Sequence, residues 1–244
     1  MSKDFSIPYI AFFGRPLDEY LAMFMLTEVD LRSGKTLDIA SGPSSFRAEG
    51  TGLHHDIVAC DPMYKLSPEE ILAYGRASIA RGIEDWEKNP NFPMSGEYKV
   101  KKYAALDSFV ADYAAHRGEG AYVYGELPHL PFADRSFDRV LSGNFLFAYA
   151  HVDHGGCYDG EEFDLSFHLR AVEEIARISR HEIRLVPVEY YAPPSRAHDY
   201  RDAVCARLEE LGFRCTLQPN ELGAIMSCYT HVLVARRTQP LAHS

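Results

Sequence analysis

Short apolar segments alternate with longer helical patterns from residue 36 almost to the end of the chain. The segments predicted as strands are 36–40, 55–60, 121–125, 137–144, 181–188, 214–218 and 229–237. Strands that alternate with helices form a mostly parallel sheet with helices packed on it. The last two segments are close enough in sequence to pair antiparallel. We therefore expect an α/β, Rossmann-like doubly wound sheet of seven strands, mostly parallel with the last strand antiparallel, plus a helical cap.

Two regions lie outside this alternation, residues 1–33 and residues 62–120. The second separates two strands by far more than the usual few residues. It contains the sequence Ser67-Pro68-Glu69-Glu70, which has the form of a capping box with proline at the first helical position and predicts a helix start. We expect 1–33 to form an N-terminal helical cap, and 34–244 to form the main domain with a helical insertion at 62–120. The alternative is that both regions simply pack against the sheet.

The charge of the chain narrows the classes of ligand. The 244 residues carry a formal net charge of −10, with 35 acidic and 25 basic residues. Nucleic-acid binding depends on neutralising phosphates with Lys and Arg, so the composition disfavours DNA or RNA as a partner and favours a small molecule or a protein. The sequence shows no secretory signal and no apolar run of the roughly 20 residues that span a bilayer. The five cysteines form no C-x-x-C pair, so we expect a cytoplasmic protein without a structural metal site.

Acidic and small residues gather where the predicted strands end. Asp38 and Gly42 lie in "LDIASGP", and Asp61 ends the second strand 19 positions after Gly42. This spacing is near that at which an acid accepts hydrogen bonds from ribose hydroxyls. Glu126 follows the third strand. Each feature alone is more often a helix cap or a solvated charge, but their order on three consecutive strands indicates a nucleoside-binding site.

The same segments resemble the class I S-adenosylmethionine-dependent methyltransferases. "LDIASGPSSF" is similar to the first motif of that family, LDxGxGxG, and "ACDPMY" to the acidic end of its second strand. "GELPHLPFADRSFDRVLSGNFLF" is very close to the signature of its third and fourth strands, and this LPF…SFD stretch is the most specific part. The resemblance covers roughly residues 34–190, although the usual PGG before the fifth strand is missing.

The resemblance implies roles for residues near the first two strands. Asp38, together with the backbone near Ala40 and Gly42, would hold the methionine portion of S-adenosylmethionine. Asp61, followed by Pro62, would bind the two ribose hydroxyls. Because this cofactor has no phosphate, its loop needs fewer glycines than a dinucleotide loop, and alanine can stand at position 40 where its φ angle is negative.

Further roles fall after the third and fourth strands. Glu126 stands where the family often has an acid contacting the adenine amino group, and Leu127 would lie against the adenine ring. Asn144 and Phe145 would face the sulfonium and the acceptor. The tetrapeptide D/N-P-P-Y is absent, and "SGNF" stands in its place, which disfavours adenine amines and glutamine amides as acceptors.

Catalytic candidates follow the fourth strand, in "AYAHVDHGGCYDGEEFD". His151 or His154 could remove a proton from the acceptor, since histidine titrates near neutral pH, and Asn144 would stand beside them. The alternatives are a solvent-facing loop or a divalent metal site, for which no recognised ligand spacing is present. The predicted function is methyl transfer to a small-molecule acceptor through O, N or S. Alternatives are a protein or RNA methyltransferase, or a non-catalytic cofactor-binding protein. The sequence gives no oligomeric state.

Aromatic residues in the two outlying regions have two interpretations. Tyr9, Phe12, Phe13, Tyr20 and Tyr64 could form an aromatic pocket, or they could belong to the core as aromatic stripes usually do.

Overall fold

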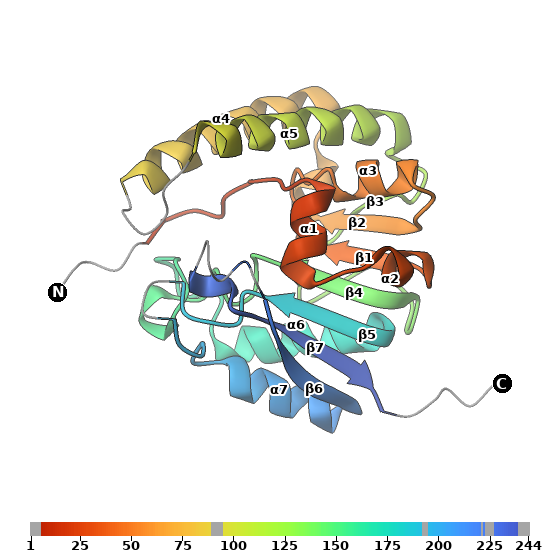
Figure 1. Cartoon of the computed structure of the whole chain (residues 1–244), viewed down its shortest axis with the longest axis vertical. Helices are drawn as coiled ribbons and strands as arrows, with labels where there is room; N and C mark the ends of the chain where they lie inside the picture. The colour runs from red at the N-terminus through yellow and green to blue at the C-terminus, as the bar shows by residue number, and fades with distance from the viewer. Residues whose placement is uncertain (1–5, 89–94, 192–194, 221, 223–226, 239–244) are drawn as a thin grey trace.

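Seven strands form one sheet in the order β3-β2-β1-β4-β5-β7-β6 (Figure 1). The structure is a computed structural model that describes residues 6–88, 95–191, 195–220, 222 and 227–238. The strands are β1 Thr36–Ile39, β2 Ile57–Asp61, β3 Tyr122–Tyr124, β4 Phe137–Gly143, β5 Ser179–Val186, β6 Phe213–Pro219 and β7 His231–Arg237. Strand β7 runs antiparallel to both of its neighbours, β5 and β6, and the other pairs are parallel. The predicted Rossmann-like sheet with a reversed last strand is confirmed.

The two central strands explain why the sheet forms where it does. Every residue of β1 and of β2 is buried, as expected for parallel strands covered on both faces. In register, Ile39 pairs with Cys60 of β2 and with Ser142 of β4. Asp61, at the end of β2, pairs with Tyr124 of β3. The carboxyl ends of four strands therefore meet at one edge of the sheet, which is where ligands of open α/β folds bind.

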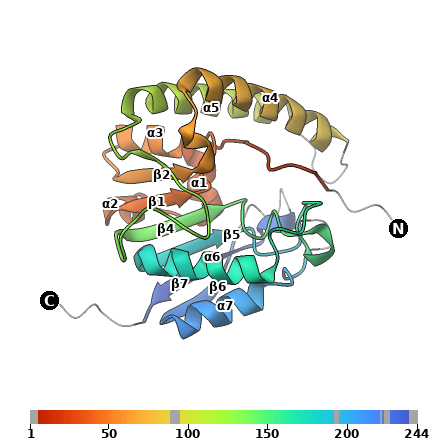
Figure 2. The ribbon, with the colours of Figure 1, turned by 180° about the vertical axis from the view of Figure 1, so that it is seen from behind.

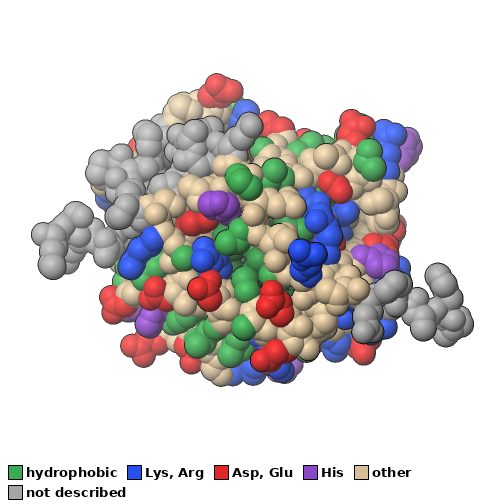
Figure 3. All heavy atoms as spheres, turned by 60° about the horizontal axis from the view of Figure 1, so that its bottom comes forward, with side chains coloured by type: hydrophobic (Ala, Val, Ile, Leu, Met, Phe, Trp, Pro, Cys, Tyr) green, Lys and Arg blue, Asp and Glu red, His purple; other side chains and the backbone are tan. Residues whose placement is uncertain are grey.

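Helices cover both faces of the sheet (Figure 2). Helices α6 Leu165–Ile178 and α7 Arg201–Glu210 pack on one face, whereas α1 Leu17–Phe24, α2 Glu28–Arg32 and α3 Phe46–Gly52 pack on the other. Leu211 caps the C-terminal end of helix α7, and the next residue, Gly212, has a φ of 84°, the left-handed conformation that glycine commonly adopts just past a helix. On the face shown in Figure 3, acidic and basic side chains are interspersed with hydrophobic ones.

The insertion between β2 and β3 consists of two long helices that lie side by side, α4 Pro68–Glu87 and α5 Gly96–His116 (Figure 1). The predicted capping box is present: Ser67 Oγ accepts from Glu70 N at 3.2 Å, and Glu70 Oε2 accepts from Ser67 N at 2.8 Å. Helix α5 begins at Gly96 because Ser95 caps it, with Ser95 Oγ accepting from Tyr98 N at 3.0 Å. The buried residues of this layer pack on Tyr122 of β3.

Residues 7–16 form an extended N-terminal segment that crosses the carboxyl edge of the sheet beneath α4 and α5 (Figure 1). The carbonyl oxygen of Arg15 accepts from Ser44 Oγ at 2.8 Å and from Ser45 N at 3.1 Å. A Cβ atom on Gly14 would lie 2.0 Å from the carbonyl oxygen of Pro43. The loop after β1 thus holds this segment in close contact.

Some predictions can be compared only with the described residues. Residues 219–227, which separate the last two predicted strands, lie largely outside them. Among the described residues no helix is long and apolar enough to cross a membrane. The division into an N-terminal cap and a main domain stays a prediction.

Candidate active site

The loop that follows β1 turns back on itself through two left-handed residues. Ala40 has a φ of 53° and Gly42 a φ of 57°. The expectation of a negative φ at Ala40 is therefore wrong, and alanine there costs about 1–2 kcal/mol relative to a right-handed conformation. The turn brings Gly42 N within 2.9 Å of Asp61 Oδ2, and the hydroxyl of Tyr64 donates to the carbonyl oxygen of Gly42 at 2.7 Å. Ala40 thus adopts the left-handed backbone conformation that is typical of glycine.

Asp61 is fixed at the end of β2 by backbone amides. Its Oδ1 accepts from Met63 N at 2.8 Å, and its Oδ2 accepts from Gly42 N. Burial raises the pKa of this carboxyl to about 6. Since a carboxylate oxygen can accept two hydrogen bonds, both oxygens keep capacity for further donors. Asp61 therefore has the geometry needed to bind a pair of hydroxyls.

Asp38 lies one layer behind the loop. Its Oδ2 accepts from Tyr20 Oη at 2.8 Å and from Ser41 Oγ at 2.5 Å, while its Oδ1 is buried without a partner among the described residues. Burial raises the pKa of Asp38 to about 7. Tyr20 and Ser41 both line a cavity that Asp38 itself does not reach. Asp38 consequently orients two hydroxyl groups instead of facing a ligand directly.

A cavity of about 550 Å³ lies over the carboxyl ends of β1, β2 and β3. Its lining includes eight of the nine predicted cofactor residues: Ala40, Gly42, Asp61, Pro62, Glu126, Leu127, Asn144 and Phe145. Tyr9 and Phe12 of the N-terminal segment also line it. The structure thus brings together residues from four strand ends, as the motif positions predicted. We call this space the larger cavity.

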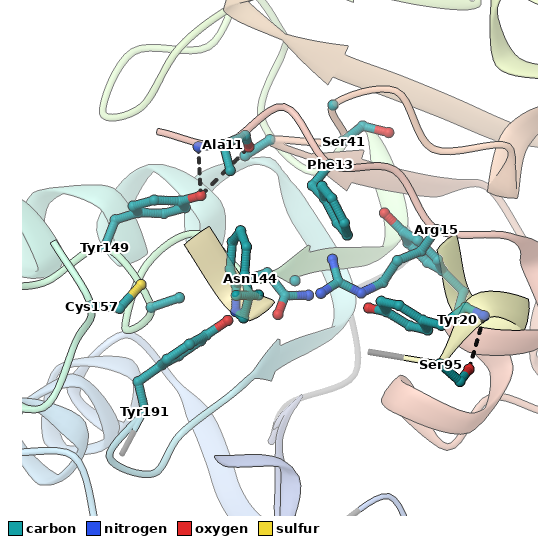
Figure 4. A pocket seen from close by; sticks show the side chains of 16 residues that line it. Ala11, Phe13, Arg15, Tyr20, Ser41, Ser95, Asn144, Tyr149, Cys157 and Tyr191 are labelled. Carbon is teal, nitrogen blue, oxygen red and sulfur yellow. Dashed lines mark hydrogen bonds between the residues drawn. The ribbon is translucent and has the colours of Figure 1, made fainter. Parts of the chain in front are cut away.

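A second cavity, of about 320 Å³, adjoins the first (Figure 4). Aromatic side chains dominate its wall, and they are Phe13, Tyr20, Trp86, Tyr98, Tyr149 and Tyr191. Arg15, Ser95 and Cys157 add polar groups. Burial raises the pKa of the Cys157 thiol, so this group stays protonated at neutral pH. We call this space the smaller cavity.

The two cavities meet at Ala11, Ala40, Gly42, Asn144 and Tyr149, which line both.

Asn144, the residue just past β4, is held rigidly at this junction. It has a φ of 56°, and its backbone N donates to the carbonyl oxygen of Val186 at 2.8 Å. Its Oδ1 accepts from Tyr229 Oη, and its Nδ2 lies 3.3 Å from Met23 Sδ. Because Val186 holds its backbone while Tyr229 and Met23 hold its side-chain amide, Asn144 presents a defined surface to both cavities.

The two predicted catalytic histidines line neither cavity. His151 begins the short helix η2 Val152–His154, and its Nδ1 accepts from Asp153 N at 3.2 Å. His154 is 48% exposed and lies 3.4 Å from Asp199. Because neither ring lines a cavity, the geometry gives their proposed role as bases no support. Among the described residues no group of three or more His, Cys, Asp or Glu side chains could hold a metal ion.

The aromatic prediction for the two outlying regions has three outcomes. Tyr9 and Phe12 line the larger cavity, and Phe13 and Tyr20 line the smaller one. Tyr64 lines neither and belongs to the core.

Sequence reasoning missed most of the smaller cavity. Arg15, Tyr98, Tyr149 and Tyr191 converge from distant parts of the chain, and Tyr229 donates to Asn144 across 85 positions. None of them lies in a motif. The only local signal was the density of aromatic residues between positions 9 and 20.

Comparisons with known proteins give a relative in sequence and several likenesses in structure. No protein-family model matches the chain. Magnesium protoporphyrin IX methyltransferase from Synechocystis PCC 6803 with bound SAM is 12% identical, with 91% of this chain and 78% of that chain covered and a TM-score of 0.47. A SAM-dependent methyltransferase from Aquifex aeolicus is 14% identical, with 89% and 91% covered and a TM-score of 0.44.

The sequence comparison is the stronger of the two. The uncharacterized protein MJ0045 of Methanocaldococcus jannaschii is 35% identical over 182 residues, which cover 72% of this chain and 76% of that protein. The chain therefore belongs to the same protein family as MJ0045.

Proposed function

We propose that this protein is an S-adenosylmethionine-dependent methyltransferase that acts on a small-molecule acceptor. The observation that carries the proposal is the pair of adjoining cavities, which meet at Ala40, Gly42 and Asn144. A reaction between two ligands needs them held in contact and aligned, and two cavities with a shared wall provide for this.

The residues of the larger cavity fit the adenosine portion of the donor. Asp61 keeps free acceptor capacity on both oxygens and lines the cavity beside Pro62. Glu126 is exposed and also lines the cavity, where it would accept from the adenine amino group, and Leu127 supplies an apolar surface for the ring. The methionine portion would lie near Ser41 and the junction. The donor supplies a methyl group bonded to a positively charged sulfur.

The smaller cavity would hold the acceptor. At about 320 Å³ it lies at the lower end of the range found for small-molecule sites. The aromatic walls exclude water and offer flat surfaces. Asn144 and the backbone of Gly42 lie at the junction, where they would orient the reacting groups. The N-terminal segment forms part of the wall of this space over the sheet edge, which favours a small acceptor over a macromolecule.

Binding and product analysis test the proposal. Isothermal titration with S-adenosylmethionine and S-adenosylhomocysteine should show micromolar or tighter binding. Incubation of the protein with a cell extract and methyl-labelled donor should place label in the fraction that passes a 3 kDa filter. Label retained with protein or RNA would exclude the small-molecule acceptor. Absence of binding by either ligand at millimolar concentration would exclude a methyltransferase.

A further inference from the structure

The side chain of Arg15 enters the smaller cavity from the N-terminal segment. Figure 4 shows its guanidinium near Phe13 and Tyr20, extending toward Asn144. The side chain is 14% exposed, and its Nη2 donates to Tyr229 Oη at 3.2 Å. Its carbonyl oxygen is fixed by the loop after β1. Arg15 is thus a positioned cation within an aromatic wall.

The positive charges around Arg15 exceed the negative ones. Arg15 Nε lies 3.6 Å from Glu19 Oε2, and Lys102 Nζ lies 2.6 Å from the same oxygen. Lys102 is fully buried, and its ammonium lies 4.3 Å from the centre of the Tyr98 ring. Among the described residues, Glu19 is the one carboxylate within 4 Å of either cation. Two cations therefore share one carboxylate.

The excess of positive charge affects the pKa of Lys102. Burial and the nearby charge of Arg15 lower the pKa of Lys102 to about 7, against the opposing effects of Glu19 and the more distant Asp18. Unpaired charge in a partly desolvated site is costly, and an anion that enters the site relieves that cost.

We propose that Arg15 binds a carboxylate group of a ligand in the smaller cavity, and that this carboxylate balances the second positive charge of the Arg15–Glu19–Lys102 group. Guanidinium and carboxylate form paired, parallel hydrogen bonds, the strongest polar contact available to such a ligand. The carboxylate has two chemical sources, the methionine portion of the donor or the acceptor itself. To this extent the inference rests on the proposed function. The aromatic walls around Arg15 would favour a flat molecule if the acceptor carries the group.

The first experiment separates the two sources. Isothermal titration compares wild type with Arg15→Gln for S-adenosylhomocysteine, for 5′-methylthioadenosine, which lacks the amino acid, and for benzoate and indole-3-acetate as aromatic carboxylates. If the donor is the source, Arg15→Gln weakens S-adenosylhomocysteine at least 30-fold and leaves methylthioadenosine unchanged. If the acceptor is the source, S-adenosylhomocysteine binds unchanged, and the aromatic carboxylates bind wild type alone.

The second experiment tests whether removing a negative charge tightens ligand binding and removing a positive charge weakens it. Glu19→Gln leaves two cations without a carboxylate, so it should tighten binding of the carboxylate ligand at least threefold. Lys102→Met leaves Glu19 to pair with Arg15 alone, so it should weaken that binding. The double variant Glu19→Gln/Lys102→Met avoids burying an unpaired ammonium and should still bind more tightly than Lys102→Met. A merely structural role for these residues would weaken binding in every variant.

Protonation gives a third readout. An anion at Arg15 reduces the repulsion on Lys102, so wild type should take up a fraction of a proton on binding at pH 7. Titration in buffers of different ionisation enthalpy measures this uptake, which Lys102→Met should abolish.

The inference is overturned if Arg15→Gln changes neither the ratio of S-adenosylhomocysteine to methylthioadenosine affinity nor the binding of aromatic carboxylates. Its failure is distinct from failure of the proposed function. Wild type that binds methylthioadenosine, with no effect of Arg15→Gln, keeps the cofactor site and loses the role of Arg15. Wild type that binds aromatic carboxylates through Arg15, but no adenosyl ligand, keeps the role of Arg15 and loses the methyltransferase.

Discussion

Replacing Asp61 tests the cofactor site most directly. Its two oxygens each accept one backbone amide and line the larger cavity. Two ribose hydroxyls would add two hydrogen bonds to a charged acceptor, each worth about 1.5–3 kcal/mol. Asp61→Ala should thus weaken binding of S-adenosylhomocysteine by about 3–6 kcal/mol, which is more than 100-fold. Asp61→Asn should cost about half as much, because one acceptor oxygen remains.

The measurement is isothermal titration at pH 7.5, with thermal unfolding recorded for each variant. Asp56→Asn is the matched control, because Asp56 is an exposed acid at the opposite end of the same strand. Its affinity should equal that of wild type. Folded Asp61→Ala that binds S-adenosylhomocysteine within threefold of wild type would refute the assignment of Asp61 to the ribose.

Three further predictions concern pH and packing. Because the pKa of Asp61 is about 6, S-adenosylhomocysteine affinity should fall about tenfold per unit below pH 6, and a flat profile by titration from pH 7 to 5 would contradict this. The pKa of Asp38 is raised from 3.8 to about 7, so protonated Asp38 contributes most to stability below pH 4. The free energy of unfolding should therefore fall by roughly 4 kcal/mol as the pH rises to 7. In urea unfolding, Asp38→Asn should show a smaller fall over the same pH range. Gly14→Ala, whose Cβ would meet Pro43, should lower the free energy of unfolding by about 1–3 kcal/mol, whereas Gly52→Ala has open space and should cost less than 0.5 kcal/mol.

The residues of the larger cavity were predictable because most of them lie at strand ends inside local motifs. Asp61 and Gly42 could be paired from their spacing alone, and the structure joins them by a hydrogen bond of 2.9 Å. The helix start at Ser67 was equally local, since a capping box spans four residues. Such features need no knowledge of the tertiary structure.

The smaller cavity was not predictable, because its residues come from distant parts of the chain. Arg15 and Tyr229, which are hydrogen-bonded, are 214 positions apart, and no sequence period connects them. His151 and His154 follow β4, but they lie at a short helical turn and line neither cavity. The conformation of Ala40 was also not predictable, because the turn after β1 requires a positive φ angle that alanine rarely adopts.

The N-terminal segment forms part of the wall of both cavities, through Ala11 at their junction, Phe12 on one side and Arg15 on the other. A single stretch of chain would therefore contact both ligands of the proposed reaction. Displacing it would open both compartments together, so donor and acceptor would not exchange independently while it stays in place. In the proposed methyltransferase, the order in which substrates enter and products leave would depend on this segment, which the loop after β1 holds through Ser44 and Ser45.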